Sequence, residues 1–122
     1  MNFSMRVILI ASMLGGIAAC TTATSTISPD NAARATAIAK LTGSASAGSV
    51  VYSSTGRCLS CHGADGKGQP EVDLAEPAKN DPVAGLAGYV LNGIAPKMPS
   101  ASSLSDQQIA DVVAYLKATY GK

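Results

Sequence analysis

The chain has 122 residues, a length that allows one domain but not two. Only 14% of its residues are charged and its formal net charge is +1, so nothing in the charge indicates a nucleic-acid-binding protein. The sequence has no Trp, and its one Phe is Phe3. A domain this small and this poor in aromatic residues is expected to need additional apolar volume for its core.

Residues 1–19 have the order of a secretion signal. Arg6 supplies a positive charge, and the uncharged, mostly apolar run that follows ends in small residues. The run is shorter than the roughly 20 residues that cross a bilayer. We therefore expect residues 1–19 to be a signal peptide that is removed on export, into an oxidising compartment outside the cytoplasm.

The end of this segment, Leu14-Gly15-Gly16-Ile17-Ala18-Ala19-Cys20, resembles the signal of bacterial lipoproteins. The resemblance implies cleavage just before Cys20 and a lipid on its sulfur. A lipid would also account for an exported cysteine without a disulfide partner, because the other two cysteines belong to a motif described below. The expected location is the periplasmic side of a bacterial membrane, anchored at Cys20. A soluble periplasmic protein is the alternative.

Residues 20–44 are expected to be the linker of this anchor. The stretch from Thr21 to Ser28 is small and polar and has no apolar period. Residues 29–41 are compatible with a short helix, with Ser28 as cap, Pro29 at the first position and Gly43 as stop. The compact domain is accordingly expected to cover residues 45–122.

Helices are expected within residues 45–122, but no strand pair. The first covers residues 47–57. Residues 63–80 are rich in Gly and Pro and are expected to be mainly loop. A second helix begins at Asp81 as cap, with Pro82 at its first position, and ends at Gly93.

The last helix has the clearest start signal. Ser105 and Gln108 form an S-x-x-Q capping box, and Leu104 and Ile109 have the spacing of a hydrophobic staple. An apolar stripe then continues at helical spacing to Tyr120. The expected fold class is all-α.

Cys58-Leu59-Ser60-Cys61-His62 is a C-x-x-C-H motif, the attachment pattern of c-type haem. Two thiols three positions apart on a helical turn can form thioethers to the two vinyl groups of one haem. His62 follows directly and would be held beside the iron as an axial ligand. Such attachment makes the haem difficult to lose outside the cell.

Three other interpretations of the cysteine pair remain. A thioredoxin-like motif would be expected in a βαβ context, which the sequence does not indicate. A zinc site needs about four ligands, and the chain has one His and one cysteine besides the pair. A plain disulfide between Cys58 and Cys61 is the third.

A second axial ligand follows by elimination. His62 is the only His in the chain, so two histidines of one chain cannot hold the iron. Met1, Met5 and Met13 lie in the predicted signal, which leaves Met98. It lies on a loop between Pro96 and Pro99 that is expected to be stiff. A Met/His pair raises the reduction potential, suits electron transfer and leaves no open iron position.

From about residue 45 to its end, the chain resembles a small bacterial class I cytochrome c. The resemblance implies one haem c enclosed by a few helices, with the first and last helices crossing at Gly48 against Tyr115 or Leu116. The residues that carry it follow in family order: Gly48 and Tyr52, Cys58 to Gly63, Ala64 to Gly68, Asn92-Gly93, Lys97-Met98-Pro99, and the helix from Leu104 to Tyr120.

The same resemblance implies a proline carbonyl that orients the axial histidine. Pro70 is the preferred match and Pro77 the alternative. Because Trp and Phe are lacking beside the haem, the pocket is expected to be aliphatic, with Tyr52 as a contributor.

The expected function is that of a single-electron carrier, not an enzyme. Its iron would bind no small-molecule substrate, and its partners would be redox proteins such as a dehydrogenase, an oxidase or a respiratory complex. One alternative is a dedicated cytochrome subunit of one such complex. Another is a haem-based ligand sensor or peroxidase, which would need an open iron position.

Overall fold

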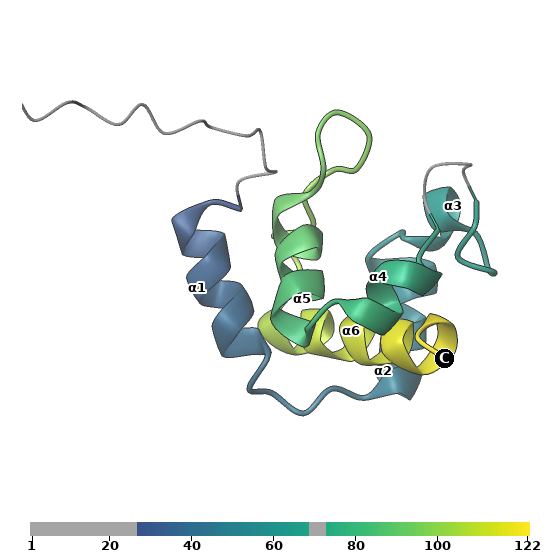
Figure 1. Ribbon diagram of the computed structural model, residues 1–122, viewed down its shortest axis with the longest axis horizontal. Helices are drawn as coiled ribbons and strands as arrows, with labels where there is room; N and C mark the ends of the chain where they lie inside the picture. The colour runs from purple at the N-terminus through teal and green to yellow at the C-terminus, as the bar shows by residue number, and fades with distance from the viewer. Residues whose placement is uncertain (1–26, 69–72) are drawn as a thin grey trace, which may run out of the picture.

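The computed structural model describes residues 27–68 and 73–122, and these residues form an all-α fold (Figure 1). This confirms the expected fold class. Within the two described ranges, the only strand-like pairing is an isolated bridge between Ile94 and Met98. The helices are α1 (Pro29–Ile38), α2 (Ala45–Val50), the π-helix η1 (Val51–Thr55), α3 (Leu59–His62), α4 (Ala75–Asn80), α5 (Val83–Asn92) and α6 (Asp106–Tyr120).

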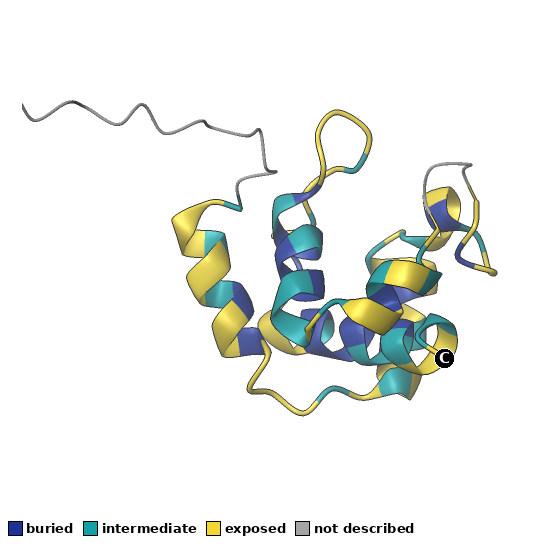
Figure 2. Cartoon of the chain, viewed as in Figure 1, coloured by how far each residue is buried: buried dark blue, intermediate teal, exposed yellow. Residues whose placement is uncertain are grey.

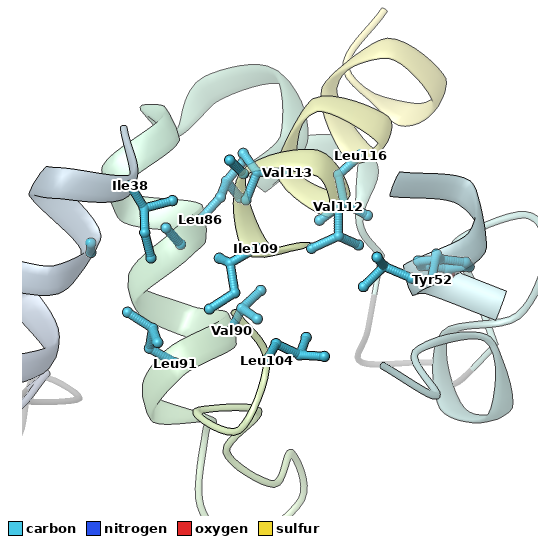
Figure 3. Packing of buried hydrophobic residues seen from close by; sticks show 14 of the residues in the cluster. Ile38, Tyr52, Leu86, Val90, Leu91, Leu104, Ile109, Val112, Val113 and Leu116 are labelled. Atoms are coloured by element: carbon cyan, nitrogen blue, oxygen red, sulfur yellow. The ribbon is translucent and has the colours of Figure 1, made fainter. Parts of the chain in front are cut away.

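The core lies around α6, which packs against α1, α2, α4 and α5. Ile109, Val112 and Val113 of α6 are almost completely buried, as the predicted apolar stripe requires. Leu91 of α5 and Ile38 of α1 face them from the other side of the core (Figure 3). No helix of the described ranges has both the length and the apolar character to cross a membrane.

The start of α6 agrees with its sequence signal. The Ser105 hydroxyl accepts a hydrogen bond from the Gln108 backbone N–H at 3.1 Å, and the Gln108 side chain accepts one from the Ser105 N–H at 2.9 Å. Leu104 and Ile109, the expected staple pair, are both buried in the core. The capping box is therefore confirmed, and it fixes the N-terminal end of α6.

The crossing of α2 and α6 depends on Gly48. The pair makes the most extensive contact between helices in the structure. A Cβ at Gly48 would overlap the carbonyl oxygen of Asp111 and lie 2.8 Å from Cβ of Tyr115. This confirms the close crossing at Gly48 and identifies Tyr115 as the residue beside it.

We predict that Gly48→Ala destabilises the holoprotein by about 1–3 kcal/mol or more, because the helices must move apart to admit a methyl group. Gly85→Ala is the matched control on α5. Its new Cβ would lie 3.4 Å from Pro82, in ordinary contact, and Ala favours a helix over Gly by roughly 0.5–1 kcal/mol. Denaturant unfolding of both variants checks the prediction, and equal stability of the two would contradict it.

Helix α1 precedes the boundary expected at residue 45, yet it packs in the core together with residues 45–122. Ser28 caps this helix as predicted, accepting a hydrogen bond from the Asn31 N–H. Ala35 and Ile38 are only 3% and 0% exposed and pack in the core. The outer face of α1 is exposed, and its inner face lies along α5 (Figure 2). The expected linker therefore contains a structural helix.

Two further expectations between residues 63 and 83 are corrected. The segment expected to be mainly loop contains α4. The glycines and prolines around this helix predict loop structure and give no signal for it. Asp81 does not cap α5; it ends α4, and Pro82 precedes α5 without a side-chain cap. Lys117 of α6 holds this junction, donating to the carbonyls of Ala78 at 3.2 Å and Asp81 at 2.7 Å.

The helix expected over residues 47–57 begins and ends earlier. It consists of α2 followed directly by η1, where the Gly56 N–H bonds to the Val51 carbonyl at 2.7 Å. A π-helical turn inserts an extra residue into the helical path, and such turns are frequent at functional sites. Here η1 buries Val51 and Tyr52, and the C-x-x-C-H motif begins just after it.

Candidate haem site

The C-x-x-C-H motif folds as one short helix, α3. Cys58 stands at its N-cap, and its carbonyl accepts hydrogen bonds from the N–H groups of Cys61 at 3.2 Å and His62 at 2.9 Å. This places the two thiols one helical turn apart, as attachment to one haem requires. Both are free thiols, so the structure does not form the alternative disulfide. Residues 27–68 and 73–122 hold no group of three or more His, Cys, Asp and Glu side chains suited to a metal ion.

The His62 side chain is buried, with 8% of the residue exposed. Its Nδ1 is shielded from solvent and has no hydrogen-bond partner among the described residues. Burial lowers the pKa of the imidazole, which favours the neutral form that coordinates metals. An unpaired buried nitrogen is costly. Among the described residues, the Nδ1 of His62 therefore lacks the polar partner that a buried imidazole needs.

A loop of residues 63–68 folds back against the motif. The Gly68 N–H donates to the His62 carbonyl at 2.8 Å. A Cβ at Gly68 would overlap the Cys61 carbonyl oxygen, so only Gly fits there. Gly63 and Gly66 have φ angles of 71° and 73°, in the left-handed region that favours glycine. The glycine-rich pattern after His62 thus serves close approach to the motif backbone.

Two tyrosines hold this loop from the core side. The Tyr52 hydroxyl donates to the Gly63 carbonyl at 2.7 Å, and the Tyr120 hydroxyl donates to the Ala64 carbonyl at 2.8 Å. With Tyr115 they form an aromatic cluster in which ring centroids are 5.1–6.1 Å apart. Burial raises the pKa of both Tyr52 and Tyr120, so both phenols stay protonated and able to donate.

We predict that Tyr52→Phe lowers the stability of the holoprotein by about 1 kcal/mol, the usual net value of such a hydrogen bond. Tyr120→Phe is the matched variant, since it removes an equivalent bond at a more exposed carbonyl. It should cost less, because water can replace the lost partner. Denaturant unfolding separates the two, and a larger cost for Tyr120→Phe would contradict this ranking.

Met98 lies on the Met98 loop, which we define as residues 93–101. The backbones of Ile94 and Met98 exchange two hydrogen bonds of 2.8 Å, which close the tip. Gly93 has a φ of 67°, and a Cβ there would overlap the Met98 carbonyl oxygen. The Ala101 N–H donates to the Val90 carbonyl of α5 at 2.9 Å. The loop is therefore tied at its tip and at its end.

The Met98 loop and α3 both lie above α6 in the view of Figure 1. Ile94 on the loop and Leu59 on α3 keep 43% and 37% of their surface exposed. Among the described residues between Tyr52 and Ala78, no apolar side chain is buried. The motif is thus held by backbone hydrogen bonds and lacks an apolar core of its own. An apolar group such as a haem fits this arrangement and the donor set of two thiols and an imidazole.

Other predicted site residues are placed less directly. Pro70 and Cys20 lie outside the described residues. The Pro77 carbonyl belongs to α4 and accepts the Asp81 N–H at 2.9 Å, and it makes no hydrogen bond to the Nδ1 of His62. Tyr52 lies in the core, where its hydroxyl holds the loop of residues 63–68 through the Gly63 carbonyl.

Sequence reasoning missed Tyr120 and Gly68 as parts of the site. The sequence places Tyr120 on the apolar stripe of α6. Its hydrogen bond to the Ala64 carbonyl depends on the tertiary contact between the last turn of α6 and the loop of residues 63–68. The signal for Gly68 was present, because it ends the glycine-rich run after His62.

Comparison with known proteins agrees with the site. A family model described as "Cytochrome C oxidase, cbb3-type, subunit III" matches residues 43–116, which include α3, the Met98 loop and most of α6. No curated protein and no solved structure matches the chain. The match supports a cytochrome c domain that carries electrons and implies a covalently bound haem c. The chain belongs to the family of cytochrome c oxidase, cbb3-type, subunit III, and is a cytochrome c of class I.

Proposed function

We propose that this protein is a monohaem electron carrier whose haem is attached at Cys58 and Cys61, with iron held by His62 and Met98. The carrying observation is α3, which sets two free thiols one turn apart and buries the adjacent imidazole, whose Nδ1 has no partner among the described residues. A bound haem would supply one-electron exchange between ferric and ferrous iron. Cys58 and Cys61 would hold the haem through thioethers, formed by addition of each S–H across a vinyl double bond, and His62 and Met98 would be the ligands of its iron.

The second ligand favours electron transfer over the other haem functions. With His62 and Met98 both bound, the iron keeps no open position for a substrate, as a peroxidase or ligand sensor would require. The hydrogen-bonded tip of the Met98 loop favours electron transfer, because a ligand held on a rigid loop moves little when the iron changes oxidation state. Pro70 remains our choice for the carbonyl that orients His62, whose Nδ1 lacks a partner among the described residues.

Absorption spectra of the purified oxidised and reduced protein test the proposal. We expect the spectrum of a low-spin c-type haem, with a weak sulfur-to-iron band in the oxidised form. A high-spin spectrum that shifts with cyanide or carbon monoxide would favour the sensor or peroxidase function instead.

The partner is expected to be a redox protein at the membrane. The name of the matched family describes an oxidase subunit, which supports a dedicated subunit as the second candidate function. Purification of the membrane fraction in mild detergent distinguishes the two. A free carrier would elute alone, whereas a subunit would co-purify in fixed ratio with an oxidase or dehydrogenase.

We further propose that the mature protein begins at Cys20 and is lipid-anchored on the periplasmic side of the membrane. Each buried methylene contributes about 0.8 kcal/mol, so two or more acyl chains hold firmly where one does not. Because α1 begins at Pro29, only residues 21–28 remain as tether. At about 3.3–3.6 Å per residue, such a segment reaches less than roughly 30 Å even when fully extended.

We predict that Cys20→Ser releases the protein from the membrane fraction or blocks its maturation, while haem attachment is unaffected. Fractionation and the mass of the mature N-terminus check this. An unmodified wild-type protein that begins elsewhere and stays soluble would refute the anchor and leave the haem proposal intact.

A further inference from the structure

Helix α1 lies outside the segment that matches the family model, yet it contacts the residues that flank the Met98 loop on both sides. At the start of the loop, the Asn92 side-chain oxygen accepts hydrogen bonds from the Ser28 N–H at 3.4 Å and from the Asn31 side chain at 3.3 Å. Asn92 is the last residue of α5 and directly precedes the loop. The N-terminal turn of α1 therefore holds the point where the loop leaves α5.

Arg34 holds the segment that leaves the loop. Its guanidinium donates to the carbonyl of Ser102 at 2.9 Å and to the carbonyl of Leu104 at 2.7 Å. Its Nε donates to the Asp106 carboxylate at 2.6 Å. These three bonds join α1 to the whole connection between the loop and α6. Hydrogen bonds from a charged donor are stronger than neutral ones, and the planar guanidinium holds several acceptors at fixed positions.

The helix that carries Arg34 is itself fixed. Ala35, the next residue, and Ile38, one turn later, are both buried against the core. Arg34 is partly shielded, with 30% of its side chain exposed. Because the helix cannot slide without exposing these apolar residues, the guanidinium acts from a rigid support.

We propose that α1 braces the Met98 loop, with Arg34 as its principal positioning residue. The inference rests on Met98 being an axial ligand, as proposed above. Outward movement of its loop would carry a methionine ligand away from the iron. Bonds that hold both ends of the loop raise the free energy of that movement and so protect the methionine bond against competing ligands.

Imidazole, titrated into the ferric holoprotein, measures this protection directly. Imidazole binds the iron only when Met98 leaves, so the sulfur-to-iron band disappears as it binds. We expect Arg34→Ala to bind imidazole about tenfold more tightly than wild type, a change of about 1.4 kcal/mol, because the variant loses the charge-assisted bonds that hold the segment after the loop. Asn31→Ala should shift the affinity in the same direction by less, because its bond is neutral.

Lys117→Ala is the matched control. Lys117 also donates from a cationic side chain to two carbonyls, but at the opposite end of α5. It should lower global stability in denaturant without changing imidazole affinity by more than about twofold. A purely structural role for Arg34 would move only global stability, as Lys117 does.

Tighter imidazole binding in Arg34→Ala and Asn31→Ala, with none in Lys117→Ala, would support the brace. Affinity in both α1 variants equal to that of wild type or of Lys117→Ala would overturn it. Met98→Ala separates this failure from failure of the proposed function: if that variant keeps the sulfur-to-iron band, the ligand assignment itself is wrong.

Discussion

Replacing Met98 with Ala is expected to lower the reduction potential and abolish the sulfur-to-iron absorption band of the oxidised protein. A thioether ligand favours ferrous iron, so its loss shifts the equilibrium toward the ferric form. The shift should be a sizeable part of the roughly 0.8 V over which axial ligands tune haem potentials. The open position should also bind cyanide or carbon monoxide readily. Potentiometry and absorption spectra measure both effects.

Ile94→Ala is the matched control for this change. Ile94 lies on the same loop and is exposed, and its bridge to Met98 uses backbone atoms that the substitution keeps. The control should retain the band and a potential close to that of wild type. An unchanged spectrum in Met98→Ala would show that another group is the sixth ligand.

The double variant Cys58→Ala, Cys61→Ala is expected to yield no covalent haem protein. Without thioethers, the haem would be held only by axial ligands and contacts. The motif region buries no apolar side chain of its own between Tyr52 and Ala78 in the described residues. We therefore also expect fast amide hydrogen exchange over residues 56–68 in this variant, because bound cofactor no longer adds its binding energy to the native state.

Cys20→Ser is the control here, since it removes the third cysteine but not the motif. Its haem content should equal that of wild type. Haem staining of denatured protein on a gel, together with hydrogen exchange, checks the prediction. Wild-type haem content in the double variant would contradict attachment at Cys58 and Cys61.

Much of the helical framework follows from local signals in the sequence. The box of Ser105 and Gln108, the stop at Gly93 and the crossing at Gly48 each depend on residue types with a narrow structural use. These features agree with the structure. The motif likewise predicts the short helix α3, because its spacing specifies one helical turn.

The misplaced elements depend on contacts that no local pattern encodes. A short helix is expected over residues 29–41, but within a linker; no local pattern predicts that Ala35 and Ile38 of α1 pack against α5 and α6. Helix α4 lies among glycines and prolines and is held from outside by Lys117. Asp81 is a residue type that often caps the start of a helix, but in the structure it lies at the end of α4 and does not cap α5.

Acid–acetone extraction of the denatured protein tests the central claim of covalent haem attachment most directly. We expect the haem colour to stay with the precipitated polypeptide, and the mass of the protein to exceed that of its processed and lipid-modified chain by one haem. Haem recovered in the organic phase, with a polypeptide of unmodified mass, would contradict the account.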